Sequence, residues 1–256
     1  MTPDAALEYL RRTLAPYLEA THVSWPERAP RRHENRTALL VSPHPDDESI
    51  NGALALRLRR EAGWTIYNHA FSFGSNPDRR PERKRELDAA LAILGFRDAG
   101  DRPIPELLAS LRPSVVIFPH GQDVHPTHLR AHRVVEDALV ATGYSGYVAR
   151  WEFWHPSARP NLLLEVHPED CATLLAATAA HVGEVLRNPY HLRMPFWMVE
   201  NTRRGSERVL GNAQSTTGYL LSTLYEWARY ENGREVETPQ GRAVSAAEFT
   251  LISDLR

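Results

Sequence analysis

Short apolar runs and amphipathic segments alternate along the first two thirds of the chain. Apolar runs that end at turn residues are typical of strands, whereas apolar positions three and four residues apart are typical of helices. We predict strands at 38–41, 65–72, 114–118, 146–152 and 161–166, and helices at 4–19, 47–62, 104–111, 168–186 and 218–230, with a charged helix that closes at Gly95 and another that begins at Pro126. This alternation predicts an α/β fold with a Rossmann-like, mostly parallel sheet flanked by helices.

The C-terminal part of the pattern is less regular. Residues 188–198 are aromatic without a clear period, and the tail 237–256 alternates weakly, which predicts one more strand or a hairpin. Because no linker interrupts the 256 residues, we predict a single domain over 1–256. Within it, 1–36 is a helix with its connection and 188–256 shapes the substrate site. The N-terminal helix could pack on the core or mediate self-association, so a homo-oligomer stays open.

Charge and composition narrow the classes of partner. With 30 basic and 32 acidic residues the net charge is −2, which gives no reason to expect a nucleic-acid partner. The single cysteine, Cys171, excludes an intramolecular disulfide, and its apolar helical surroundings predict a buried thiol. No apolar run approaches the roughly 18 residues that span a bilayer. The first twenty residues carry Asp, Glu and Arg, so we expect a soluble cytoplasmic protein.

Ionisable residues cluster where the first predicted strand ends. The run 38–41 stops at Ser42-Pro43, and His44, Asp46 and Asp47 follow before the helix. The carboxyl ends of strands are where open α/β sheets bind ligands. His44 and Asp47 can share one cation, and imidazole with carboxylate suits zinc or a similar divalent metal. The alternative is that Asp46 or Asp47 only caps the helix.

A second cluster, His125-Pro126-Thr127-His128, also follows an apolar strand and opens a helix. Two such turns can meet at one edge of a sheet, which favours a metal site over a simple cap. Spacing alone leaves the ligand undecided. His128 and His132 lie one helical turn apart, as in helical zinc pairs, and His125 would then be a cap.

The sequence Pro43-His44-Pro45-Asp46-Asp47-Glu48, followed by His125-Pro126-Thr127-His128, resembles the PIG-L/LmbE-like family of zinc-dependent N-deacetylases. Between these motifs, Arg83, Glu86, Leu87, Ala90, Leu94 and Gly95 match that family's R-x-x-E-L-x-x-A-x-x-x-L-G helix. The resemblance covers about residues 37–140. Thr127, where many relatives have Asp, and Asn51-Gly52-Ala53, where relatives often have a Gly-rich turn, depart from the pattern.

The resemblance implies a role for each motif residue. His44, Asp47 and His128 would bind Zn²⁺ or another divalent metal, while His132 would either support the ligands from behind or be structural. Asp46 would be the general base and His125 the general acid. Arg83 and Asp101 are expected to bind the substrate, by analogy with pocket residues of relatives.

The implied activity is metal-dependent hydrolysis of the N-acetyl group of a small N-acetylated amino sugar or conjugate. Alternatives are an amidase that acts on a non-sugar amide, or a member that binds metal or sugar without catalysis. A nucleotide-binding domain is disfavoured because the chain has neither G-x-G-x-x-G nor a Walker-type glycine loop. The natural substrate does not follow from the sequence.

Overall fold

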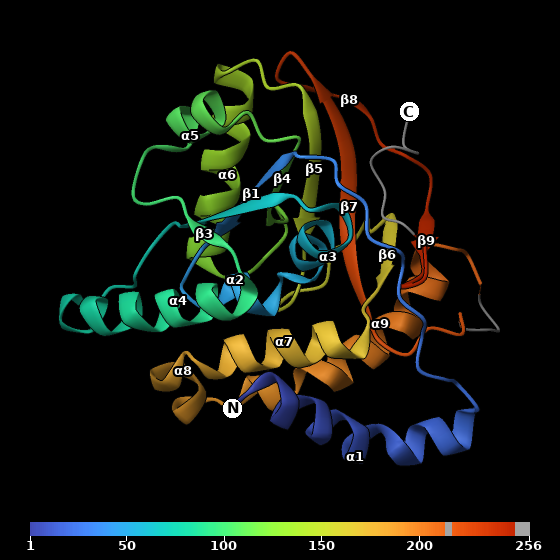
Figure 1. Cartoon of the computed structure of the whole chain (residues 1–256). Coiled ribbons are helices and arrows are strands. Elements are labelled where there is room, and N and C mark those ends of the chain that lie inside the picture. The colour runs from blue at the N-terminus through green and yellow to red at the C-terminus, as the bar shows by residue number, and fades with distance from the viewer. Residues whose placement is uncertain (213–216, 249–256) are drawn as a thin grey trace.

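The structure is a computed structural model that describes residues 1–212 and 217–248 (Figure 1). Within these residues, nine strands form one sheet in the order β3-β2-β1-β4-β5-β7-β6-β9, with β8 paired to β7. The strands are β1 Thr37–Ser42, β2 Thr65–Ala70, β3 Arg97–Asp98, β4 Val115–Pro119, β5 Gly146–Trp151, β6 Leu162–Glu165, β7 Ser222–Glu231, β8 Arg234–Glu237 and β9 Arg242–Val244. The five strands from β3 to β5 are parallel, and β7 runs antiparallel to β5 and β6. The predicted Rossmann-like, mostly parallel α/β fold is therefore confirmed.

Helices cover both faces of the sheet. They are α1 Pro3–Thr21, α2 Asp47–Ile50, α3 Ala53–Ala62, α4 Arg80–Leu94, α5 Ile104–Leu111, α6 Pro126–Ala141, α7 Pro168–Ala179, α8 Val182–Arg187 and α9 Met194–Arg208, with 3₁₀ turns η1 Pro77–Arg79 and η2 Tyr190–Leu192. Alternate residues of each strand face opposite sides. Leu40 packs in the core with α3, α4 and α7, whereas Leu39 packs in the core with α5 and α6.

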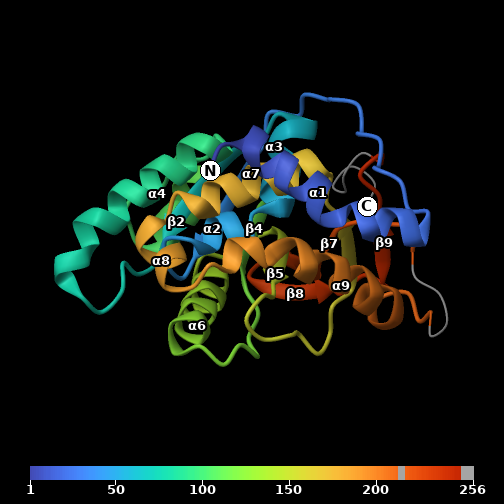
Figure 2. The same ribbon diagram turned by 90° about the horizontal axis from the view of Figure 1, so that it is seen from below.

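The N-terminal helix α1 packs on the core. Ala6, Leu10 and Leu14 are buried, and α1 lies against α7, which separates it from the sheet (Figures 1 and 2). Among the residues described, no helix is long and apolar enough to cross a membrane.

The order of the central strands defines where a ligand can bind. β1 and β4 are parallel neighbours, and from them the chain continues to β2 on one side and to β5 on the other. The connections leave the carboxyl ends of β1 and β4 in opposite directions, and such a switch point opens a crevice. Both histidine motifs follow these two strand ends.

The prediction of a helix at 218–230 is wrong. This segment contains β7, which pairs with β5 on one edge and β6 on the other and is buried along most of its length. A strand buried on both faces does not show polar–apolar alternation. Leu220, Leu221, Leu224 and Trp227 therefore mimic helical spacing, and periodicity alone cannot distinguish the two.

Two predicted helices are each divided in two. The 47–62 segment breaks at Asn51-Gly52 between α2 and α3, where a Cβ on Gly52 would lie 2.2 Å from the Glu48 carbonyl oxygen. The 168–186 segment breaks at Ala180-His181 between α7 and α8. His181 has a non-helical backbone there, and its side chain contacts Glu48. Of the predicted tail strand, β9 lies within the described residues, and 249–256 lie outside them.

Candidate metal centre and active-site cavity

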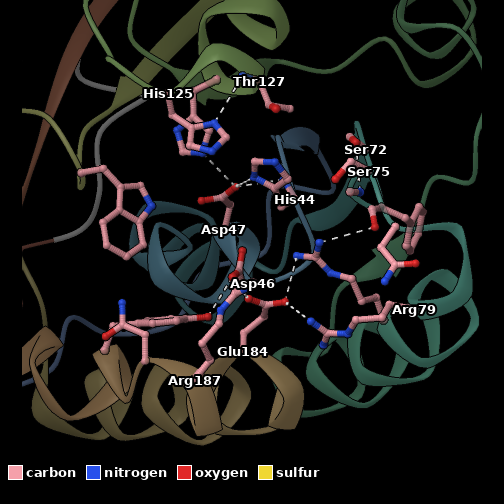
Figure 3. A pocket seen from close by; sticks show the side chains of 18 residues that line it. His44, Asp46, Asp47, Ser72, Ser75, Arg79, His125, Thr127, Glu184 and Arg187 are labelled. Atoms are coloured by element: carbon pink, nitrogen blue, oxygen red, sulfur yellow. Dashed lines mark hydrogen bonds and ion pairs between the residues drawn. The ribbon is translucent and has the colours of Figure 1, made fainter.

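A cavity of about 650 Å³ opens at the carboxyl ends of β1 and β4 (Figure 3). Its walls come from the turn after β1, the loop after β2, the start of α6, and the α8–η2 segment. Six of the seven predicted site residues line it: His44, Asp46, Asp47, Arg83, His125 and His128. Two motifs about 80 residues apart thus converge, as the strand order requires.

Three side chains present metal donors to one point. The Asp47 Oδ2 atom lies 3.5 Å from His44 Nδ1 and 3.5 Å from His128 Nε2. Ligand atoms of a tetrahedral zinc site lie about 3.4 Å apart, given bonds of about 2.0–2.1 Å. Both distances from Asp47, and the nitrogen and oxygen donors of this trio, fit a zinc ion. A donor atom of His125 also lies within 4.8 Å of donor atoms of His44 and His128, so this histidine must be considered separately.

Hydrogen bonds distinguish the two histidines of the second motif. His128 Nδ1 lies 2.9 Å from Asp123 Oδ2, so the neutral imidazole carries its proton on Nδ1 and turns the Nε2 lone pair, the one a metal would take, toward Asp47. His125 is the N-cap of α6, where its Nδ1 accepts from the Thr127 N–H at 3.2 Å. A neutral His125 therefore carries its proton on Nε2 and cannot ligate a metal there while it caps the helix. Neutral His125 thus donates from Nε2, whereas neutral His128 offers its Nε2 as an acceptor.

Asp123 is a site residue that the sequence analysis missed. Its side chain is buried, Oδ2 accepts from His128, and Oδ1 accepts from the His125 backbone N–H at 2.8 Å. Metal-bound histidines usually donate their second N–H to a carboxylate or carbonyl. The signal was a lone Asp in the loop before α6, five residues before a candidate ligand.

The charges of the groups around Asp47 favour the binding of a cation. Burial opposes ionisation of Asp47, but the His128 charge and hydrogen bonding with His44 outweigh it and lower the pKa of Asp47. Burial likewise opposes protonation of His128, yet Asp47 and Asp123 raise its pKa above the usual value. Burial and the charges of His128 and His44 lower the pKa of His125 and keep that imidazole neutral.

Asp46 is held apart from this donor set by a strained backbone. Its φ of 131° and ψ of −33° lie in a region that non-glycine residues rarely occupy. Its Oδ2 accepts from the Tyr190 hydroxyl at 2.8 Å, and its backbone N–H donates to Glu48 Oε2 at 2.9 Å. Burial and the adjacent Asp47 charge raise the pKa of Asp46 to about 8. A cation bound at Asp47 would lower it again and favour the carboxylate.

Glu48 and His181 form a buried pair behind Asp46. Glu48 Oε1 lies 2.6 Å from His181 Nε2, and both side chains are fully buried. Glu48 therefore links the start of α8 to the Asp46 backbone and supports the strained turn. Tyr190 was not recognised from sequence because it lies in the irregular aromatic region, 144 residues from Asp46.

The other histidines near the second motif lie away from the donor trio. His132 Nδ1 contacts the Pro119 carbonyl oxygen at 3.0 Å, and this histidine lines a separate cavity of about 340 Å³ together with Glu136 and Arg150. The His128–His132 pair therefore does not face one point. His120 Nε2 contacts the carbonyl oxygen of His155 at 2.8 Å. His120 thus contacts none of the donor trio, and Asp123 takes the position beside His128.

The two expected substrate-binding residues lie in different places. Arg83 lines the cavity, and it donates to the Pro45 carbonyl oxygen at 3.3 Å. Asp101 is exposed and lines a neighbouring hollow with Lys84 and Asp98. The structure does not bring Asp101 into the cavity.

This chain resembles known proteins in its sequence and in its fold. No family model matches the chain. A curated relative, 1D-myo-inositol 2-acetamido-2-deoxy-alpha-D-glucopyranoside deacetylase 2 from Catenulispora acidiphila, is 30% identical over an alignment that covers 54% of this chain and 63% of the relative. This chain thus spans less than two thirds of the length of that relative.

Two solved structures share the fold. N,N'-diacetylchitobiose deacetylase from Pyrococcus horikoshii, complexed with its inhibitor MPG, has a TM-score of 0.58 and 13% identity, and the match covers 86% of this chain and 92% of the other. The 4-carboxy-2-hydroxymuconate hydratase from Pseudomonas putida has a TM-score of 0.57 and 20% identity, with 74% and 95% covered. A hydratase shares this fold, so the fold alone does not define the reaction.

The predicted resemblance to the PIG-L/LmbE-like deacetylases is confirmed by the curated deacetylase relative and by the deacetylase structure.

Proposed function

We propose that this protein is a zinc-dependent hydrolase that removes the N-acetyl group from an N-acetylglucosamine-like moiety or a related amide. His44, Asp47 and His128 are the proposed metal ligands. The observation that carries the proposal is the convergence of these side chains in one cavity. Asp47 Oδ2 lies 3.5 Å from a nitrogen of His44 and of His128, the neighbouring Asp46 accepts from Tyr190, and His125 Nδ1 accepts from the Thr127 N–H, which leaves its Nε2 to donate. The curated deacetylase relative supports the same reaction class.

Zinc in this site would supply Lewis-acid chemistry, which acidifies water and polarises an acyl oxygen. Asp46 takes the proton of the attacking water, since its carboxylate faces the cavity and Tyr190 fixes one of its oxygens. His125 offers its Nε2 proton, first as a hydrogen bond to the developing oxyanion and then to the departing amine. The products are acetate and the free amine, and exchange with solvent returns the proton from Asp46 to His125.

Two measurements test this proposal. Protein purified without added zinc should contain about one divalent metal per chain, as measured by elemental analysis. A panel of N-acetylated amino sugars, scored by release of free amine, should show turnover that a chelator abolishes and zinc restores. Metal without amine release from any sugar or simple amide would favour a non-catalytic binding protein. Amine release only from non-sugar amides would favour the amidase alternative.

A further inference from the structure

The cavity wall beside Asp46 carries three arginines that no step of the proposed reaction uses. Arg79 comes from the end of η1, Arg83 from α4 and Arg187 from the end of α8, and all three line the cavity. They surround one buried carboxylate, Glu184, with Arg79 and Arg187 on either side of it (Figure 3). We call Arg79, Arg83, Arg187 and Glu184 the arginine lobe.

The positive charge of the arginine lobe exceeds what its own acid neutralises. Glu184 Oε1 lies 3.1 Å from Arg79 Nη1 and 3.8 Å from Arg83 Nη2, and its Oε2 pairs with Arg187. One carboxylate thus faces three guanidinium groups. Glu82, 3.8 Å from Arg79 Nε, is half exposed and does not line the cavity. Asp46 and Asp47 line the cavity too, but they belong to the catalytic turn and the proposed metal site.

Most hydrogen-bond donors of the lobe have no acceptor among the described residues. A guanidinium has five N–H donors. Within the described residues, Arg83 reaches only the carbonyl oxygens of Phe73 at 3.4 Å and Pro45 at 3.3 Å, besides its longer ion pair with Glu184. Arg79 and Arg187 each donate one hydrogen bond, to Glu184. Guanidinium groups bind carboxylates and phosphates through paired hydrogen bonds, which suits an anion in the cavity.

The lobe adjoins the reacting centre. The Pro45 carbonyl that accepts from Arg83 belongs to the residue before Asp46, so the lobe and the proposed base share one stretch of wall. An anionic group bound there would be a substituent of the amino sugar itself or of the unit attached to that sugar. We propose, building on the proposed deacetylation, that the natural substrate carries a phosphate or carboxylate group and that Arg79 and Arg187 select it.

Matched substrates test this specificity. N-acetylglucosamine and its methyl glycoside are the neutral members, N-acetylglucosamine 1-phosphate and 6-phosphate carry a phosphate, and N-acetylmuramic acid carries a carboxylate. The zinc-loaded enzyme should show a higher kcat/KM for at least one anionic member than for the neutral ones. That preference should fall about 10- to 100-fold in Arg79→Gln and in Arg187→Gln, the effect of losing a hydrogen bond to a charged group.

The control is Arg85→Gln, which removes the same charge from an exposed position on α4 that does not line the cavity. It should keep the preference. The member with the largest preference identifies phosphate or carboxylate as the natural group. Equal turnover of neutral and anionic members, lowered alike by Arg79→Gln and Arg187→Gln, would show that the lobe only clamps α8 to η1 and would overturn the inference.

A binding measurement separates this inference from the proposed function. If no substrate releases amine, calorimetry with inorganic phosphate on the zinc-loaded protein still decides. Phosphate binding that weakens about 10-fold or more in Arg187→Gln but not in Arg85→Gln would support the anion site while the deacetylation proposal fails. Binding that is equal in all variants, or absent from the wild type, would overturn the anion site.

Discussion

Replacing Asp123 should show whether the proposed metal site depends on the protonation pattern of His128. The Asp123 carboxylate accepts two hydrogen bonds, from His128 Nδ1–H at 2.9 Å and from the His125 backbone N–H at 2.8 Å. In Asp123→Asn only one of the two side-chain oxygens remains, and the new NH₂ group must face one of these donors. The backbone N–H cannot change, whereas His128 can move its proton from Nδ1 to Nε2. We therefore expect the amide oxygen to face His125 and the NH₂ group to donate to His128 Nδ1.

That arrangement places a proton on the nitrogen that faces Asp47, and it blocks the proposed ligand atom. Loss of a group that orients a metal-bound histidine weakens metal binding by about 10- to 100-fold, or about 1.4–2.7 kcal/mol. Asp123→Asn should lie at the upper end of this range. Asp123→Ala should lie at the lower end, because a water molecule can accept from His128 Nδ1 in the vacated space. The isosteric variant is thus expected to be the more damaging one.

Zinc affinity is measured by competition with a chelator of known affinity, with Asp137→Asn as the control. Asp137 is an exposed residue of α6, so its variant should bind zinc as the wild type does. Thermal unfolding in excess chelator checks that neither Asp123 variant has lost its fold. If Asp123→Asn binds zinc as tightly as the wild type, or more tightly than Asp123→Ala, the tautomer argument is wrong.

Three further predictions concern the division of labour in the cavity. Asp46→Asn should keep the metal and lose turnover by about 10²- to 10⁴-fold, and the acidic limb of its pH–rate profile should vanish or shift, because the base must be ionised to accept a proton. Asp47→Asn should instead lose metal, and its activity should recover partly in excess zinc. Metal loss in Asp46→Asn with metal retained in Asp47→Asn would exchange the two roles. His128→Ala should strip the metal while His132→Ala retains it, as read by elemental analysis; the opposite result would restore the one-turn pair. Tyr190→Phe removes the hydroxyl that donates to Asp46, so kcat should fall about 10-fold, while zinc content stays unchanged and KM nearly unchanged. A rise in KM of the same size would indicate a role in substrate binding.

Local sequence was enough to determine the turns that carry the site. An apolar run, a break at Ser42-Pro43 and a helical pattern define one strand–turn–helix unit, and Val115 to Phe118 with Pro126 define the second. Alternation of such units also predicts a parallel sheet, in which both motifs lie at the carboxyl edge, and the strand order then makes β1 and β4 neighbours. Both motifs therefore lie at the predicted edge of the sheet, whereas the choice of His128 over His132 as a ligand came only from the family resemblance, because spacing left it open.

Pairings between distant segments were decided only by tertiary structure. Tyr190 reaches Asp46 across 144 positions and His181 reaches Glu48 across 133, because α7 packs against α2 and also contacts α8 and η2, which follow it in the chain. The apolar residues around β7 have a helical spacing, but the segment is a strand because both of its edges are paired in the sheet. Sequence patterns report each residue's own burial and backbone preference, whereas the partner of a buried polar group depends on how whole elements dock.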